Sequence, residues 1–174
     1  MKKETFILKN HNNQQKEIEI NATLEIKEKN IRTHFEITGE IENYLFDEQE
    51  TEKREDELWK RTCFELFIAN NKSSQYYELN LSPSTEWNFY TFDDYKKNMR
   101  EERSISLPSI SFHHNKESYS LSVTFDLKKE LLDSISFNLA VILLDKNNIR
   151  HFYSINRKDG QVDFHDRAYW SLKQ

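Results

Sequence analysis

Two segments in the middle of the chain place carboxyl and amide side chains opposite apolar ones. Cys63–Ile68 has one wholly apolar face if it is extended, and Glu65 lies on the opposite face. Tyr76–Ser82 repeats this pattern and sets Glu78 and Asn80 opposite its own apolar face. Carboxyl and amide groups are suited to hydrogen bonding with hydroxyl-bearing ligands. We therefore predict a polar, partly aromatic strip on one face of a sheet.

The register between the two segments follows from matching their apolar faces. With a loop at 70–75, this matching pairs Glu65 with Asn80 and Phe67 with Glu78. A slip by one residue would bury the carboxyl groups and expose the leucines, so the parity is well specified. Further residues follow soon enough to border the strip: Trp87, Tyr90 and Arg100.

The rest of the chain predicts the sheets that would hold this strip. Apolar and polar residues alternate over Ile18–Ile26 and again over Ile31–Ile41, which predicts a hairpin with its tip at Lys29-Asn30. Ser136–Leu144 is apolar at most positions on both faces, which predicts a central strand covered on both sides. The other predicted strands are Glu4–Lys9, Thr62–Ala69, Tyr76–Ser82, Trp87–Phe92, Ser104–Phe112, Tyr119–Phe125, Ile149–Ile155 and Ala168–Leu172.

Helical character is confined to Leu127–Asp133, one or two turns with Asp126 as a possible N-cap. Many short strands with almost no helix predict an all-β fold: a jelly-roll-like β-sandwich of two antiparallel sheets with one short helix. The length of 174 residues suits one domain, 1–174. The acidic run Asp47–Glu57 is interpreted as a solvated loop, with a cation-attracting rim as the alternative.

Composition excludes several classes of function. A net charge of −5 argues against nucleic acid and against anionic membranes as partners. Two glycines leave little room for a glycine-rich phosphate loop, and Cys63 as the only cysteine excludes an intrachain disulfide and a cysteine-rich zinc site. Neither a signal-peptide pattern nor an apolar run of membrane-spanning length is present, so we expect a soluble, cytoplasmic protein.

Three motifs together carry a resemblance to a known family. The blocks LWKRTCFELFI, YYELNLSPSTEWNFYTFDDYKKNMR and HFYSINRKDGQVDFHD resemble the bacterial DOMON-like family, which is related to the family 9 carbohydrate-binding modules. The resemblance covers roughly Arg54 to the C-terminus. It implies a jelly roll with a ligand site on its concave face, for a sugar or, in some relatives, haem. The site residues that it implies are Trp59, Arg61, Glu65, Asn80, Trp87, Tyr90, Arg100, Asp163 and His165.

The resemblance implies a non-catalytic domain that binds a small ligand, a carbohydrate or polyol, with the aromatic rings stacking on the sugar and the polar groups meeting its hydroxyls. A packing role for Trp59 and Trp87, and an ion pair of Arg61 with Glu65, stay open as alternatives. A carbohydrate-active enzyme using Glu65 and Glu78 is a second hypothesis. A module that binds an unknown protein partner is a third.

Metal and haem sites are disfavoured by the residues at hand. Asp163 and His165, with His151, would be a two- or three-ligand start for a metal, but an Asp-x-His pair is more often an orienting hydrogen bond. Haem would need an axial set such as Met99 with a histidine. We therefore expect no cofactor and no metal, and interpret Cys63 as a small buried residue.

Overall fold

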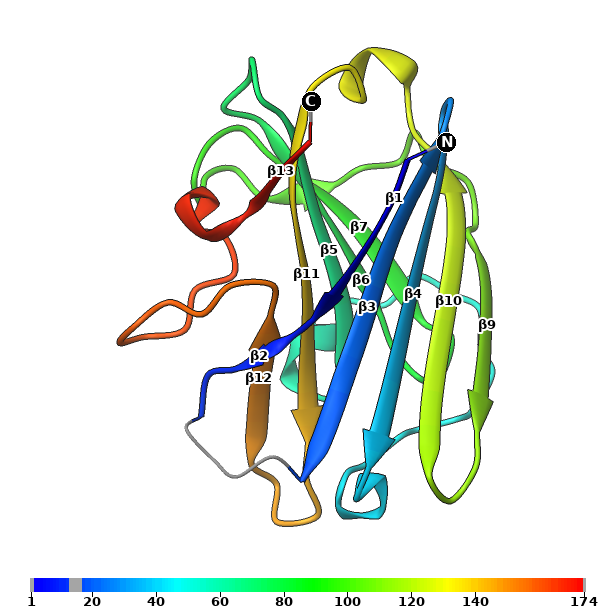
Figure 1. Ribbon diagram of the computed structural model, residues 1–174. Coiled ribbons are helices and arrows are strands. Elements are labelled where there is room, and N and C mark those ends of the chain that lie inside the picture. Colours follow the sequence, from blue (N-terminus) through cyan, green and yellow to red (C-terminus); the bar gives the residue numbers. More distant parts are fainter. Residues whose placement is uncertain (1, 13–16, 174) are drawn as a thin grey trace.

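The computed structural model describes residues 2–12 and 17–173, which form two antiparallel β-sheets packed face to face (Figure 1). The smaller sheet has five strands and places the 18–39 hairpin at its centre. The hairpin turn lies at Glu28-Lys29, one residue before the predicted tip, and Glu28 there takes a left-handed φ of 56°. In spatial order the strands are β1 (Lys2–Ile7), β3 (Ile18–Lys27), β4 (Asn30–Gly39), β10 (Ser118–Asp126) and β9 (Ser109–His114).

The larger sheet has eight strands and carries the segments that the sequence singled out. A short strand, β13 (Ser171–Lys173), pairs with the start of β11. The other strands run in the order β2 (Lys9–Asn10), β12 (Arg150–Ser154), β11 (Ile135–Leu144), β5 (Cys63–Asn70), β6 (Tyr76–Leu81), β7 (Trp87–Phe92) and β8 (Arg100–Glu101).

The predicted β-sandwich of two antiparallel sheets is confirmed, and so is the register at its centre. Glu65 faces Asn80 and Phe67 faces Glu78, as the matching of apolar faces required. The strand β11 lies between β12 and β5 and is buried almost along its whole length.

In the described part of the chain, helix is confined to four short 3₁₀ turns. They are η1 (Ile41–Asn43), η2 (Leu58–Lys60), η3 (Lys129–Leu131) and η4 (Arg167–Tyr169). The turn η3 falls in the predicted helical segment, but its N-cap is Lys128, because Asp126 instead accepts from Asn30 and pairs with Lys29. Within the described ranges, no helix has the length and apolar character needed to cross a membrane.

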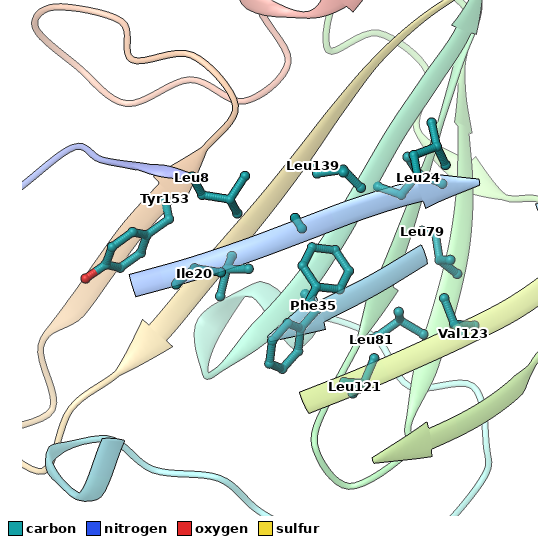
Figure 2. Close-up of a cluster of buried hydrophobic side chains, with 14 of the residues drawn as sticks. Leu8, Ile20, Leu24, Phe35, Leu79, Leu81, Leu121, Val123, Leu139 and Tyr153 are labelled. Carbon is teal, nitrogen blue, oxygen red and sulfur yellow. The ribbon is translucent and has the colours of Figure 1, made fainter. Parts of the chain in front are cut away.

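The main core fills the space between the two sheets. Figure 2 shows Ile20, Leu24 and Phe35 of the smaller sheet pointing toward Leu79, Leu81 and Leu139 of the larger one. We call the side of the larger sheet that meets this core its inner face, and the opposite side its outer face. A second, smaller cluster covers the outer face and includes Phe67, Tyr76, Phe92, Phe164 and Trp170.

Candidate binding cavity

A cavity of about 610 Å³ lies over the outer face of the larger sheet. Its floor consists of side chains from β5, β6, β7 and β11, and its walls come from η2, from the loop after β7, from β12 and from the loop after β12. Five aromatic rings line it: Trp59, Phe67, Phe92, Phe152 and Phe164. This volume lies in the range of sites for small organic ligands.

Two carboxyl groups stand on the floor. Glu65 of β5 and Glu78 of β6 are 2% and 4% exposed and both line the cavity. The register makes them diagonal neighbours on one face of the sheet, a separation that side chains can bridge. Among the described residues no lysine or arginine pairs with either of them, and the basic group nearest to Glu78 is His165, whose Nε2 lies 3.8 Å from Oε2.

Burial controls the protonation of this pair. Removal from water raises the pKa of Glu78 to about 7. Burial, reinforced by the neighbouring charge of Glu78, raises the pKa of Glu65 well above its usual value. The thiol of Cys63, next to Glu65 and fully buried, has a raised pKa for the same reason and stays neutral. At neutral pH the floor therefore holds at least one protonated carboxyl group, which donates as well as accepts hydrogen bonds.

His165 closes one side of the cavity as a neutral imidazole. Its Nδ1 lies 2.6 Å from the Tyr76 hydroxyl, which accepts a hydrogen bond from the backbone N–H of Lys96. The tyrosine hydroxyl therefore donates to Nδ1, and the remaining proton resides on Nε2, toward Glu78. Burial, together with the charge of Lys96, lowers the pKa of His165 to about 4.

Trp59 forms the opposite wall and is only partly buried. Its ring packs edge-on against Tyr90, with centroids 6.0 Å apart, and the Tyr90 hydroxyl donates to Asp56 at 2.5 Å. The Arg150 guanidinium donates to the backbone oxygen of Trp59 at 3.1 Å. These contacts tie η2 and the residue pair before it to β7 on one side and to β12 on the other.

The loop after β12 is fixed through one backbone carbonyl. Asn138 and Trp170 both donate to the oxygen of Phe164, at 3.2 and 2.8 Å. The Asp163 carboxylate pairs with Lys96 at 3.0 Å and accepts from the Tyr95 hydroxyl, which joins this loop to the loop after β7.

The structure brings together half of the predicted site residues. Five of them line the cavity: Trp59, Glu65, Glu78, Asp163 and His165.

Trp87 does not belong to this surface. It pairs with Leu81 in the register of β6 and β7, so its ring faces the inner core, where it is 3% exposed. The Arg54 guanidinium covers the ring at 4.2 Å from its centroid. The placement of Trp87 on the strip is therefore wrong, and the packing alternative is correct for this residue.

Arg61 and Arg100 also lie outside the cavity lining. Arg61 pairs with Glu86 and, at 3.8 Å, with Asp47, so the alternative ion pair with Glu65 is wrong as well. Arg100 is exposed and pairs with Asp93 at 2.8 Å.

Asn80 and Tyr90 lie on the outer face as predicted, but beneath its surface. Asn80 is fully buried between Glu65 and Asn88, and neither its amide nitrogen nor its amide oxygen has a hydrogen-bond partner within the described part of the chain. Tyr90 is 3% exposed behind Trp59. Neither residue lines the cavity.

Several lining residues were absent from the predicted set. Phe67 and Phe92 share the outer face with Glu65 and Glu78, so strand parity alone would have included them. Phe152, Arg150 and Lys96 come from β12 and from the loop after β7, whose approach to the floor no local pattern reveals.

No group of three or more potential metal-ligating side chains occurs in residues 2–12 and 17–173. His151 lies apart from Asp163 and His165, since it pairs with Asp145 at 2.9 Å and packs edge-on against Tyr44. Cys63 is free and buried, as predicted.

Comparison with solved structures shows which fold this is, whereas neither a family model nor a curated protein matches the sequence. A candidate carbohydrate-binding protein from Bacteroides uniformis superposes with a TM-score of 0.71 at 13% identity, over 97% of this chain and 84% of that one. Two structures of a family 9 carbohydrate-binding module from Caldicellulosiruptor kristjanssonii also match. The complex with glucose has a TM-score of 0.53 at 10% identity, covering 95% of this chain and 78% of the module. The complex with cellotriose has a TM-score of 0.56 at 12% identity, covering 96% and 76%. The chain therefore has the fold of the family 9 carbohydrate-binding modules.

Proposed function

We propose that the cavity binds a carbohydrate, or a similar polyol-bearing molecule, without cleaving it. The observation that carries this proposal is a pair of buried carboxyl groups, Glu65 and Glu78, on the floor of an aromatic-lined cavity. Buried polar groups are normally paired, because an unpaired one costs about 1–3 kcal/mol. The hydroxyl groups of a sugar would add hydrogen-bond partners for the two carboxyl groups where they line the cavity.

The walls supply the second requirement of sugar binding. A pyranose has apolar C–H patches that stack on aromatic rings, and Trp59 presents a partly exposed ring beside the floor. Phe152 is also partly exposed and lines the cavity from β12. Glucose and cellotriose are the ligands in the two family 9 module structures, which supports a saccharide as the ligand here.

The test is a calorimetric titration of the purified protein with a panel of mono- and oligosaccharides. We expect at least one saccharide to bind, and Trp59→Ala to lower its affinity at least tenfold. Arg150→Ala should weaken the affinity, whereas the matched control Arg100→Ala, outside the cavity, should leave it unchanged. A blank panel would contradict the proposal, as would equal effects of the two arginine substitutions.

A glycoside hydrolase is the second candidate function. It is favoured by one observation: the pKa of Glu78 is raised to about 7, which suits a general acid, and a second carboxyl group lies diagonally opposite. The distinguishing assay measures new reducing ends after incubation with each saccharide that binds. Turnover that Glu65→Gln and Glu78→Gln both abolish, with binding retained, would assign this activity.

Three further predictions complete the proposal: membership of the DOMON-like branch, a single domain over 1–174, and a cytoplasmic location. If the protein binds no small molecule but captures a defined protein through the same face, the interaction-module hypothesis replaces the proposal.

A further inference from the structure

The cavity floor carries two carboxyl groups, whereas the basic side chains that line the cavity lie on its walls. Lys96, the lysine on the wall, is already paired with Asp163 at 3.0 Å. Arg150 donates to the oxygen of Trp59, and its guanidinium lies 5.6 Å from the centroid of the Phe152 ring. Both basic side chains are therefore engaged at the walls, and neither pairs with a carboxyl group of the floor.

The remaining titratable groups that face the floor are neutral. Burial lowers the pKa of His165 to about 4 and raises the pKa of the Cys63 thiol. The hydroxyls of Tyr76 and Tyr90 also have raised pKa values because of burial. Among the described residues, Glu65 and Glu78 are thus the groups of the floor that can carry charge at neutral pH, and that charge is negative.

The surrounding aromatic rings also attract a cation. Aromatic faces attract cations, and this attraction is strongest where water is excluded. Phe67 and Phe92 stand beside the two carboxyl groups on the floor, and Trp59 lies above them on the wall. A floor of carboxyl groups within aromatic walls is therefore complementary to a compact organic ammonium group.

We propose that the cavity selects a sugar that carries a protonated amine over the neutral sugar of the same size, and that the ammonium group binds between Glu65 and Glu78. This inference rests on the proposed function and names its ligand class. The hydroxyls and the ring of the sugar make the contacts described above, and the amine replaces the hydroxyl that points to the floor.

Binding of an ammonium group would change the protonation of the floor. In the free protein the pair retains a proton near neutral pH, because burial disfavours the charged form of both groups and the charge of Glu78 adds to this effect at Glu65. A bound cation stabilises both carboxylates, so the retained proton leaves to solvent as the ligand enters. The affinity for an amino sugar should therefore rise with pH below about 7, whereas that for a neutral sugar should not.

Three sugars of similar shape distinguish the effect of the ligand's charge from the effect of its shape. Glucosamine carries the cation, N-acetylglucosamine carries a neutral group at the same carbon, and glucose carries a hydroxyl there. By calorimetry at pH 7, we expect glucosamine to bind at least tenfold more tightly than either neutral probe. Its affinity should rise about fiftyfold between pH 5 and pH 7, because one linked proton changes the affinity about tenfold per pH unit below the pKa of about 7. Repeating the titration in buffers of different ionisation enthalpy should show about one proton released per glucosamine bound.

Substitutions test whether the preference for glucosamine comes from the carboxyl groups of the floor. Glu65→Gln and Glu78→Gln should each reduce the preference for glucosamine over glucose to less than threefold. The matched control is Glu86→Gln, a buried glutamate that pairs with Arg61 outside the cavity and should retain the preference. If glucose binds as tightly as glucosamine at every pH, the inference fails and the proposed function stands. If none of the saccharides binds, both fail.

Discussion

The two faces of the larger sheet are built from alternate residues of the same strands, yet their chemistry is opposite. On the inner face Phe64, Leu66 and Leu79 are buried in an apolar core. On the outer face Glu65 and Glu78 are buried nearly as deeply but are ionisable, and neither pairs with a lysine or an arginine of the part of the chain that the structure describes. Burial of the apolar inner face stabilises the folded protein. Burial of polar groups on the outer face lowers that stability, because these groups lose their contacts with water. Such a difference between two faces of one sheet supports the proposal that the outer face binds a ligand.

Two tryptophans provide the sharpest test of this comparison. Trp87 is buried in the inner core, so Trp87→Ala should lower the free energy of unfolding by about 3–5 kcal/mol, the usual loss for a large aromatic core residue. Trp59 is partly exposed at the cavity wall, so Trp59→Ala should cost about 1 kcal/mol or less. Urea denaturation followed by far-UV circular dichroism measures both. Equal losses for the two variants would remove the distinction between the faces.

The same pair of residues shows where prediction from the sequence fails. The register of β5 and β6 was predictable, because each strand has one wholly apolar face and only one parity buries both faces. β7 has aromatic residues on both faces, so its pattern does not say which of them meets the core. Trp87 and Tyr90 are three positions apart on that strand and must point to opposite faces, which the prediction overlooked.

The walls were beyond prediction for a different reason. Asp163 and His165 were found through a motif, but Phe152, Arg150 and Lys96 reach the cavity only through long-range packing. The carbonyl of Phe164, held by Asn138 of β11 and by Trp170 six residues further along the chain, sets the position of one wall. No local periodicity encodes such a contact.

The second prediction concerns the pH dependence of stability. The unfolded chain loses the proton of Glu78 near pH 4, whereas the folded protein retains it up to about pH 7. Between these values the folded state binds more protons, so the contribution of Glu78 to stability falls as the pH rises. Each unit of raised pKa corresponds to about 1.4 kcal/mol. The free energy of unfolding of Glu78→Gln should therefore rise by about 3 kcal/mol relative to that of the wild type between pH 4 and pH 8.

Denaturation curves of the two proteins at several pH values give this difference directly. The subtraction is needed because other carboxyl groups act in the opposite direction: the pKa of Asp145, for example, is lowered by its hydrogen bond from His151. A constant difference between wild type and Glu78→Gln over this pH range would show that Glu78 titrates normally, and the contrast between the faces would then be one of shape alone.

The smallest expected effect concerns the wall. Trp170→Phe keeps an aromatic ring against Tyr76 and Phe67 but removes the N–H that donates to the Phe164 carbonyl. The loss should be about 1 kcal/mol of stability, the net value of one buried hydrogen bond. Affinity for a bound saccharide should fall about threefold, because Asn138 still holds the same carbonyl. Measured in parallel, an unchanged affinity would mean that this wall does not position the ligand.

The pairing of β5 with β11 also bears on how the protein reaches its native state. It joins Glu65 to Ala140, two residues from opposite halves of the chain, and it lies within the floor of the cavity. Contacts between such distant residues form slowly, because a long loop must close before they form, and sheet proteins rich in them fold in milliseconds to seconds. Neither half of the chain contains a cavity by itself. Recovery of ligand binding during refolding would therefore time the completion of the whole sandwich.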